Sequence, residues 1–131
     1  MRPKSLLPVF SLLVLASVAG CSPDSPLGVL LSPPDCTIAD IQKSDALWPQ
    51  PAKIAVTVKN RSDATAYDVE CDIKLKSGNT IVDEGAVSFG TLEGGESMTG
   101  EAWFWKISTH GDYANAAYHL FWYDSQGTYH D

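Results

Sequence analysis

The chain has 131 residues, 44% of them hydrophobic, and a formal net charge of −7. This length suits one domain, and the apolar content excludes a largely disordered chain. The acidic balance argues against a nucleic-acid partner, because binding to a phosphate backbone depends on Lys and Arg side chains that neutralise it.

The first twenty residues have the organisation of a secretory signal, with Arg2 and Lys4 before an uncharged apolar run that ends in small residues. The tetrapeptide VAGC at residues 18–21 resembles the lipobox of bacterial lipoproteins. This resemblance implies that the Cys21 thiol carries diacylglycerol and that the chain is cleaved before this residue, with the new amino terminus open to acylation as well. Each buried methylene contributes ~0.8 kcal/mol, so two or three acyl chains hold a protein firmly to a membrane.

Two other interpretations of the N-terminus stay open. In an ordinary signal peptide, Cys21 would have no special role. An uncleaved signal anchor would keep the apolar run in the membrane, with Arg2 and Lys4 on the cytoplasmic side. All three interpretations place the remaining chain outside the cytoplasm.

Residues 22–35 contain four prolines and predict an extended tether. Within this tether, the apolar run 27–31 is expected to pack on the edge of the domain, with contact to a lipid surface as the alternative. Ser22 follows the expected anchor, and by resemblance to enterobacterial sorting a residue other than aspartate favours the outer membrane. The chain therefore divides into a signal peptide (1–20), a lipidated cysteine with its tether (21–35) and one domain (36–131).

In the domain, hydrophobic and polar residues alternate with a period of two. Residues 53–60 and 66–76 show this alternation most clearly. The face expected to be buried in the second segment carries Tyr67, Val69, Cys71, Ile73 and Leu75. Alternation of this length predicts strands with one buried face. Ser77–Thr80 then predicts a tight hairpin turn.

In the next expected strand, residues 80–89, the alternation changes phase. Val82 lies on the even positions, whereas Val87 and Phe89 lie on the odd ones. A bulge at Gly85 would restore a single buried face. Further strands are expected at residues 37–42, 97–107 and 116–127, and the expected total is about seven. Short strands separated by turn signals predict an all-β fold, an immunoglobulin-like antiparallel β-sandwich.

Four motifs in residues 56–104 point to a family: V-x-N at 58–60, YDVE at 67–70, GNTIV at 78–82 and L-x-x-G-E-S at 92–97. With them the chain resembles the FxLYD-type and CARDB-like immunoglobulin-like domains of bacterial surface proteins. Lys76-Ser77 stands where that family has an aromatic-aspartate pair before the hairpin. The resemblance implies an extracytoplasmic sandwich and carries no catalytic residues across.

Two cysteines remain besides Cys21. Cys36 opens the first expected strand, and Cys71 lies on the expected buried face of another. An even pair in an oxidising compartment predicts a disulfide between them. Two buried free thiols are the alternative.

No sequence motif of a catalytic site is visible, so we expect no enzyme activity. The three histidines, His110, His119 and His130, have only Asp112 and Asp131 close by in sequence, and these spacings fit no metal motif. A surface histidine on a strand explains His119 more simply. No metal and no cofactor are expected.

Aromatic residues are more numerous on two expected strands than one core requires. Trp103 and Trp105 share one face of their strand, whereas Phe121 and Trp122 point to opposite faces of theirs. The excess is interpreted either as packing beneath the tether or the loop 106–117, or as an exposed platform for a partner.

The sequence therefore predicts a lipid-anchored envelope protein with a non-enzymatic interaction or structural module and an unidentified envelope protein as its partner. The alternative is a glycan- or peptide-binding module that uses Trp103, Trp105, Phe121 or Trp122. An enzyme or a periplasmic inhibitor is a more distant alternative.

Overall fold

A computed structural model describes residues 32–131 of the chain. The expected signal peptide, Cys21 and most of the expected tether lie outside the described residues. Residues 33–131 form one unit. Its seven strands are β1 (Cys36–Ser44), β2 (Ala52–Asn60), β3 (Ala66–Ser77), β4 (Thr80–Leu92), β5 (Ser97–Phe104), β6 (Asn115–Tyr123) and β7 (Tyr129–His130).

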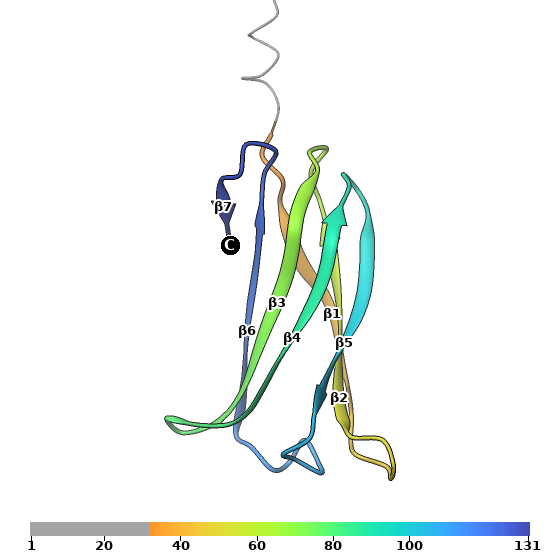
Figure 1. Cartoon of the computed structure of the whole chain (residues 1–131), viewed down its shortest axis with the longest axis vertical. Helices are drawn as coiled ribbons and strands as arrows, with labels where there is room; N and C mark the ends of the chain where they lie inside the picture. The colour runs from red at the N-terminus through yellow and green to blue at the C-terminus, as the bar shows by residue number, and fades with distance from the viewer. Residues whose placement is uncertain (1–31) are drawn as a thin grey trace, which may run out of the picture. The chain divides into compact units, whose positions relative to one another are not determined.

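The strands form two antiparallel sheets, with the orders β1-β2-β5 and β4-β3-β6-β7. The sheets pack face to face, so the predicted all-β immunoglobulin-like sandwich is confirmed (Figure 1). Strand β4 pairs with β3 in the four-stranded sheet and has no partner in the sheet of β1 and β2. Within residues 32–131 no helix is long and apolar enough to span a bilayer.

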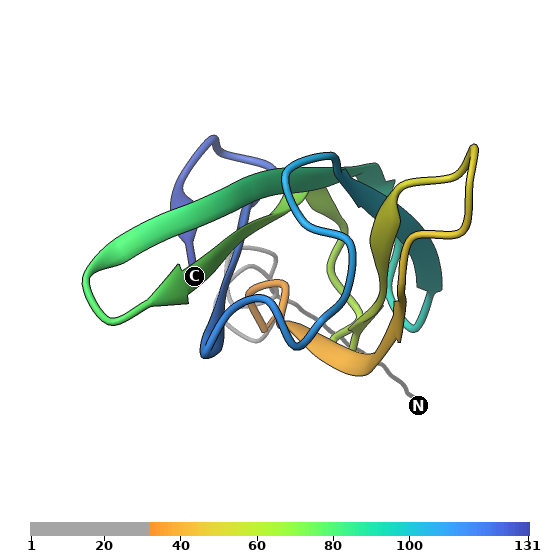
Figure 2. The same ribbon diagram turned by 90° about the horizontal axis from the view of Figure 1, so that it is seen from below.

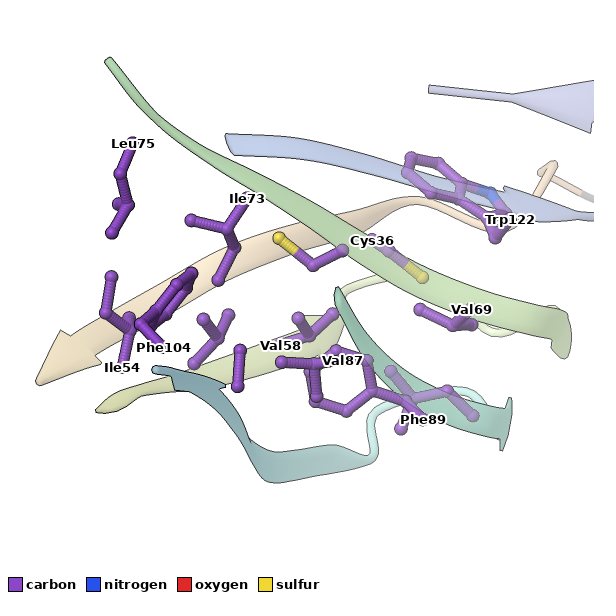
Figure 3. Packing of buried hydrophobic residues seen from close by; sticks show 14 of the residues in the cluster. Cys36, Ile54, Val58, Val69, Ile73, Leu75, Val87, Phe89, Phe104 and Trp122 are labelled. Carbon is purple, nitrogen blue, oxygen red and sulfur yellow. The ribbon is translucent and has the colours of Figure 1, made fainter. Parts of the chain in front are cut away.

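The core lies between the sheets and follows the predicted alternation. Ile54, Val56 and Val58 of β2 have no exposed surface, and neither has Phe104 of β5. Figure 3 shows Phe104 beside Ile54 toward one end of the core, and Trp122 toward the other end. Strands β2 and β5 therefore each bury one face, because side chains alternate along a strand.

Strand β3 confirms four of its five expected core positions: Val69, Cys71, Ile73 and Leu75 are fully buried. The fifth, Tyr67, is exposed, so its expected burial is wrong. The register of β3 shifts between Ala66 and Val69, and Asp68 has a φ of 51°. This irregularity turns Tyr67 outward and gives the buried position to Ala66.

The bulge predicted at Gly85 is wrong in its position. The ladder between β3 and β4 is regular from Val87 to Asp83, and the register shifts at Val82 instead. Gly85 therefore faces inward, where a Cβ would lie 3.2 Å from the Phe104 ring. The glycine makes room for the largest fully buried side chain of the core.

Cys36 and Cys71 are buried free thiols in the structure, which contains no disulfide between them. They belong to strands of different sheets. Burial is the main cause that raises the pKa of each thiol to about 11, and the carboxylates of Asp35 and Asp72 add to it. These thiols behave as small apolar side chains of the core.

Candidate functional site

The most exposed large apolar side chains of the domain lie on two neighbouring loops, β1–β2 and β5–β6. Leu47 and Trp48 of the first loop are 78% and 92% exposed, and Trp105 of the second is 74% exposed. We call these three residues the aromatic tip. Both loops lie at the same end of the sandwich, the lower end in Figure 1 and the near end in Figure 2.

Hydrogen bonds fix the backbone of the β1–β2 loop. The Leu47 N–H donates to the Gln50 carbonyl at 3.0 Å, and the Gln50 N–H donates back to the Leu47 carbonyl at 2.7 Å. The Ala46 N–H donates to the Ser108 carbonyl of the β5–β6 loop at 2.8 Å. Trp48 is therefore exposed on a turn that two hydrogen bonds close. A third hydrogen bond joins this turn to the β5–β6 loop.

His110 of the β5–β6 loop connects the two loops through its backbone and its ring. Its N–H donates to Asp45 Oδ1 at 2.9 Å. Its Nε2 lies 2.9 Å from the Ser44 carbonyl oxygen and 3.1 Å from that of Lys53, while Nδ1 lies 2.7 Å from the Tyr113 hydroxyl oxygen. Since both neighbours of Nε2 can only accept, Nε2 carries a proton and donates to them.

The backbone on both sides of Trp105 is fixed by buried groups. Phe104 before it is fully buried, and Ile107 after it is 5% exposed. The Lys106 N–H donates to Oδ2 of the buried Asp83 at 2.9 Å. The indole of Trp105 is therefore held in solvent by a backbone that has little freedom to withdraw it.

Asp112 closes the remainder of the β5–β6 loop. Its Oδ2 accepts the N–H groups of Ser108 and Thr109 at 2.9 and 3.0 Å. Hydrogen bonding from the Thr109 and Ser108 backbone is the main cause that lowers the pKa of this carboxyl. The carboxylate thus stabilises the turn that carries His110.

Trp48 and Trp105 border a shallow recess of about 170 Å³ between the loops. Its lining also includes the buried Phe104 and Ile107 and the polar Gln50 and Ser108. The recess is therefore mostly apolar, with few groups that can form hydrogen bonds.

Trp103 lies on the outer face of the three-stranded sheet and is 42% exposed. The Lys53 ammonium lies 5.5 Å from the centroid of its ring and 3.0 Å from a carboxylate oxygen of Glu101. A cation over an indole face is favourable, and this contact covers part of the ring.

The four aromatic residues singled out in the sequence do not gather at one site. Trp105 belongs to the aromatic tip and Trp103 lies near the end of β5 that leads to it, whereas Phe121 and Trp122 lie near the end of β6, toward the opposite end of the sandwich. Trp122 is 5% exposed and its Nε1–H donates to the Pro34 carbonyl at 3.1 Å, which agrees with packing beneath the tether and leaves its ring without an exposed face for a partner.

Phe121 is half-buried on the outer face of the four-stranded sheet. Its ring stacks on Tyr129 at 5.7 Å and lies 5.3 Å from the His119 ring. His119 Nε2 is 3.2 Å from Asp131 Oδ2. Within residues 32–131, no three His, Cys, Asp or Glu side chains are arranged so that they could hold a metal ion.

Leu47 and Trp48 are not among the residues that the sequence pattern singled out. The signal that could have identified them is the segment ALWPQP at residues 46–51, where two large apolar residues stand between a predicted strand end and two prolines. Prolines favour a loop there, and a loop leaves such side chains at the surface.

No family model matches the chain, and no curated protein or solved structure matches it either.

Proposed function

We propose that this chain is a lipid-anchored protein of the bacterial envelope, attached through Cys21, and that its sandwich is a non-enzymatic module for binding a protein partner. The observation that carries the binding role is the aromatic tip. Leu47, Trp48 and Trp105 stay in solvent on loops whose backbones are closed by hydrogen bonds.

A rigid, exposed tryptophan suits a protein interface in two ways. Trp is among the residues that dominate binding energies when a partner buries them. Because the loops of Trp48 and Trp105 are already ordered, association loses little conformational entropy in the backbone. Trp48 and Trp105 also line the same recess, so one partner could bury both indoles together.

The position of the tip fits an anchored protein. The chain joins the domain at Asp35 and Cys36, at the end of the sandwich opposite the tip (Figure 1). An anchor at Cys21 would attach the domain to the membrane by that end, through the proline-rich tether. The tip would then be presented away from the attachment point.

The proposed anchor rests on the VAGC tetrapeptide, and Ser22 favours the outer membrane. We expect Cys21→Ser to abolish labelling by radioactive palmitate and sedimentation with the envelope, while Ser22→Ala keeps both. A Cys21→Ser protein that is processed, labelled and sedimented like wild type would contradict the anchor.

The proposed relation to FxLYD-type and CARDB-like domains has structural support at one motif. Asn60 ends the V-x-N motif and is fully buried. Its side chain donates to the Ala64 and Leu92 carbonyls at 2.6 and 3.0 Å and so connects the end of β2 with β4. A structural role of this kind is what a fold-defining motif requires.

One observation favours a second candidate function, the binding of a glycan or an extended peptide. Trp48 and Trp105 line the apolar recess together with Gln50. Stacking on two indoles beside a few hydrogen-bonding groups is a common way to bind such ligands.

Site-specific photo-crosslinking in cells distinguishes the two functions. The full chain carries a photoreactive amino acid at Trp48 or at Trp105, with Thr91 at the opposite end as the control position. We expect one discrete protein adduct from both tip positions and none from Thr91. Adducts of equal yield from all three positions would contradict the proposal. So would the absence of tip adducts together with glycan binding that Trp105→Ala abolishes.

A further inference from the structure

Strand β6 has an open edge over most of its length. On one side it pairs with β3 from Tyr123 to Asn115, but on the other side β7 pairs only with Trp122 and Tyr123. Among the described residues, no strand pairs with that outer edge from Asn115 to Phe121 (Figure 1). A row of backbone N–H and C=O groups there is free to bond another strand.

The sandwich is also less tightly closed on this side. On β3, the inward side chains from Val69 to Leu75 are fully buried. On the adjacent β6, the inward side chains of Ala116, Tyr118 and Leu120 keep part of their surface exposed, as do Ile38 and Ile41 of β1. A strand added beside β6 would cover this half-buried apolar seam.

The opposite side of the sandwich has no such gap. There β4 and β5 approach so closely that a methyl group at Gly100 would overlap the Val87 side chain. The open seam is therefore a local feature of β6 and β1.

Strand β6 also lacks the residues with which proteins prevent edge pairing. Charged side chains and prolines protect the edges of natural sheets. The other long edge strands carry such charges, for example Glu84 on β4, Glu101 on β5 and Asp40 on β1. From Asn115 to Phe121, β6 contains no Lys, Arg, Asp, Glu or Pro.

We propose that the open edge of β6 pairs antiparallel with the same edge of a second copy of this chain, about a two-fold axis near Ala117. Such a pair gives one continuous sheet across both copies. A closed two-fold pair is the most common arrangement of identical chains.

The side chains of β6 complement themselves about this axis. Inward-pointing Tyr118 lies opposite the small Ala116 of the second copy, and outward-pointing His119 lies opposite Asn115. Ala117 lies opposite itself. The large Tyr118 therefore meets a small residue, β7 stays beyond the paired segment, and no like charges face each other, although each chain has a net charge of −7.

The pairing involves few residues, so we expect a weak dimer with a dissociation constant in the micromolar range or above. Sedimentation of the full chain in detergent, over a range of concentrations, measures it. Ala117→Glu places two carboxylates opposite each other and should weaken the dimer at least tenfold. The new Glu also lies across from Lys74 on β3, so the fold should tolerate it.

Ala86→Lys is the matched control. Ala86 is exposed on the other edge of the same sheet and lies across from Asp72 on β3, so its new charge also meets an opposite one. We expect this variant to dimerise within twofold of wild type. A monomeric wild type at millimolar concentration, or equal effects of the two variants, would overturn the proposal.

Disulfide trapping tests the register. Opposite residues of an antiparallel pair have Cα atoms about 4.5–5.5 Å apart, a separation that a disulfide can bridge. We expect Ala117→Cys to form a linked dimer under mild oxidation, whereas Ala86→Cys and wild type do not. Linkage of Ala86→Cys to the same extent would overturn the assignment to β6.

Discussion

Asn60 shows how a single buried polar side chain organises one end of the sandwich. Besides donating to Ala64 and Leu92, its Oδ1 accepts the N–H and the hydroxyl of Ser62 at 3.1 and 2.8 Å. The loop that follows β2 therefore depends on the Asn60 side chain for its hydrogen-bond partners. The sequence motif V-x-N indicated that this residue ends a strand, but its burial follows only from the loop that folds over it.

Replacing Asn60 by alanine should lower the free energy of unfolding by about 2–4 kcal/mol, because buried carbonyl groups lose their donors. Urea unfolding of the purified chain measures this difference. Asn79→Ala, in the exposed β3–β4 turn, is the control and should change stability by less than about 0.5 kcal/mol. An Asn60→Ala variant that unfolds at the wild-type urea concentration would show that the loop is held by other contacts.

The burial of the two core cysteines predicts how their thiols react with an alkylating reagent. With pKa values raised to about 11, the thiols of Cys36 and Cys71 are protonated and inaccessible in the folded domain. We expect iodoacetamide at pH 8 to leave both unmodified in the native protein and to alkylate both in urea without a reductant. No alkylation in urea before reduction would instead show the disulfide that the sequence favoured.

The raised pKa values of these two thiols predict how the stability of the domain depends on pH. The pKa of each thiol rises from 9.0 in the unfolded chain to about 11 in the folded one. Between these values the unfolded state has released protons that the folded state still holds, so the free energy of unfolding falls as pH rises from 9 toward 11. Urea titrations at several pH values measure this slope, and Cys71→Ala should reduce it. A stability that stays constant or rises over this range would contradict the burial of the thiols.

At the scale of the strands, alternation in the sequence predicted most of the fold. Strands β2 and β3 follow it closely, because a strand with one buried face requires a period of two. The two departures, at Tyr67 and Val82, both occur at register shifts. A bulge depends on how two strands pair, and that pairing cannot be seen in the sequence of one strand alone.

The approach of β4 and β5 gives a prediction about packing. Gly100→Ala should destabilise the domain by about 1–3 kcal/mol, because the added methyl group overlaps Val87. Val87→Ala removes the overlapping methyl groups and leaves a small cavity when made alone. In the double variant, we expect the free energy of unfolding to fall by less than the sum of the decreases in the two single variants. Additive losses in urea unfolding would mean that the two side chains do not meet.

At the scale of the whole molecule, the two ends of the sandwich differ in character. The end where the chain joins the domain contains Asn60 and the buried Trp122, whereas the other end exposes Trp48 and Trp105 (Figure 1). The sequence indicated an excess of aromatic residues but could not separate exposed from buried ones. Trp122 belongs to the core, stacks on His130 and donates its Nε1–H to the Pro34 carbonyl, a contact between residues 88 positions apart.

Binding at the aromatic tip can be measured directly once photo-crosslinking has identified the partner. The affinity of the full chain for that partner is compared among wild type, Trp48→Ala, Trp105→Ala and the outer-face control Thr99→Ala. We expect each tryptophan variant to weaken binding at least thirtyfold, about 2 kcal/mol, with unfolding curves unchanged and with Thr99→Ala within twofold of wild type. Wild-type affinity in both tryptophan variants would contradict the assignment of the tip as the binding surface.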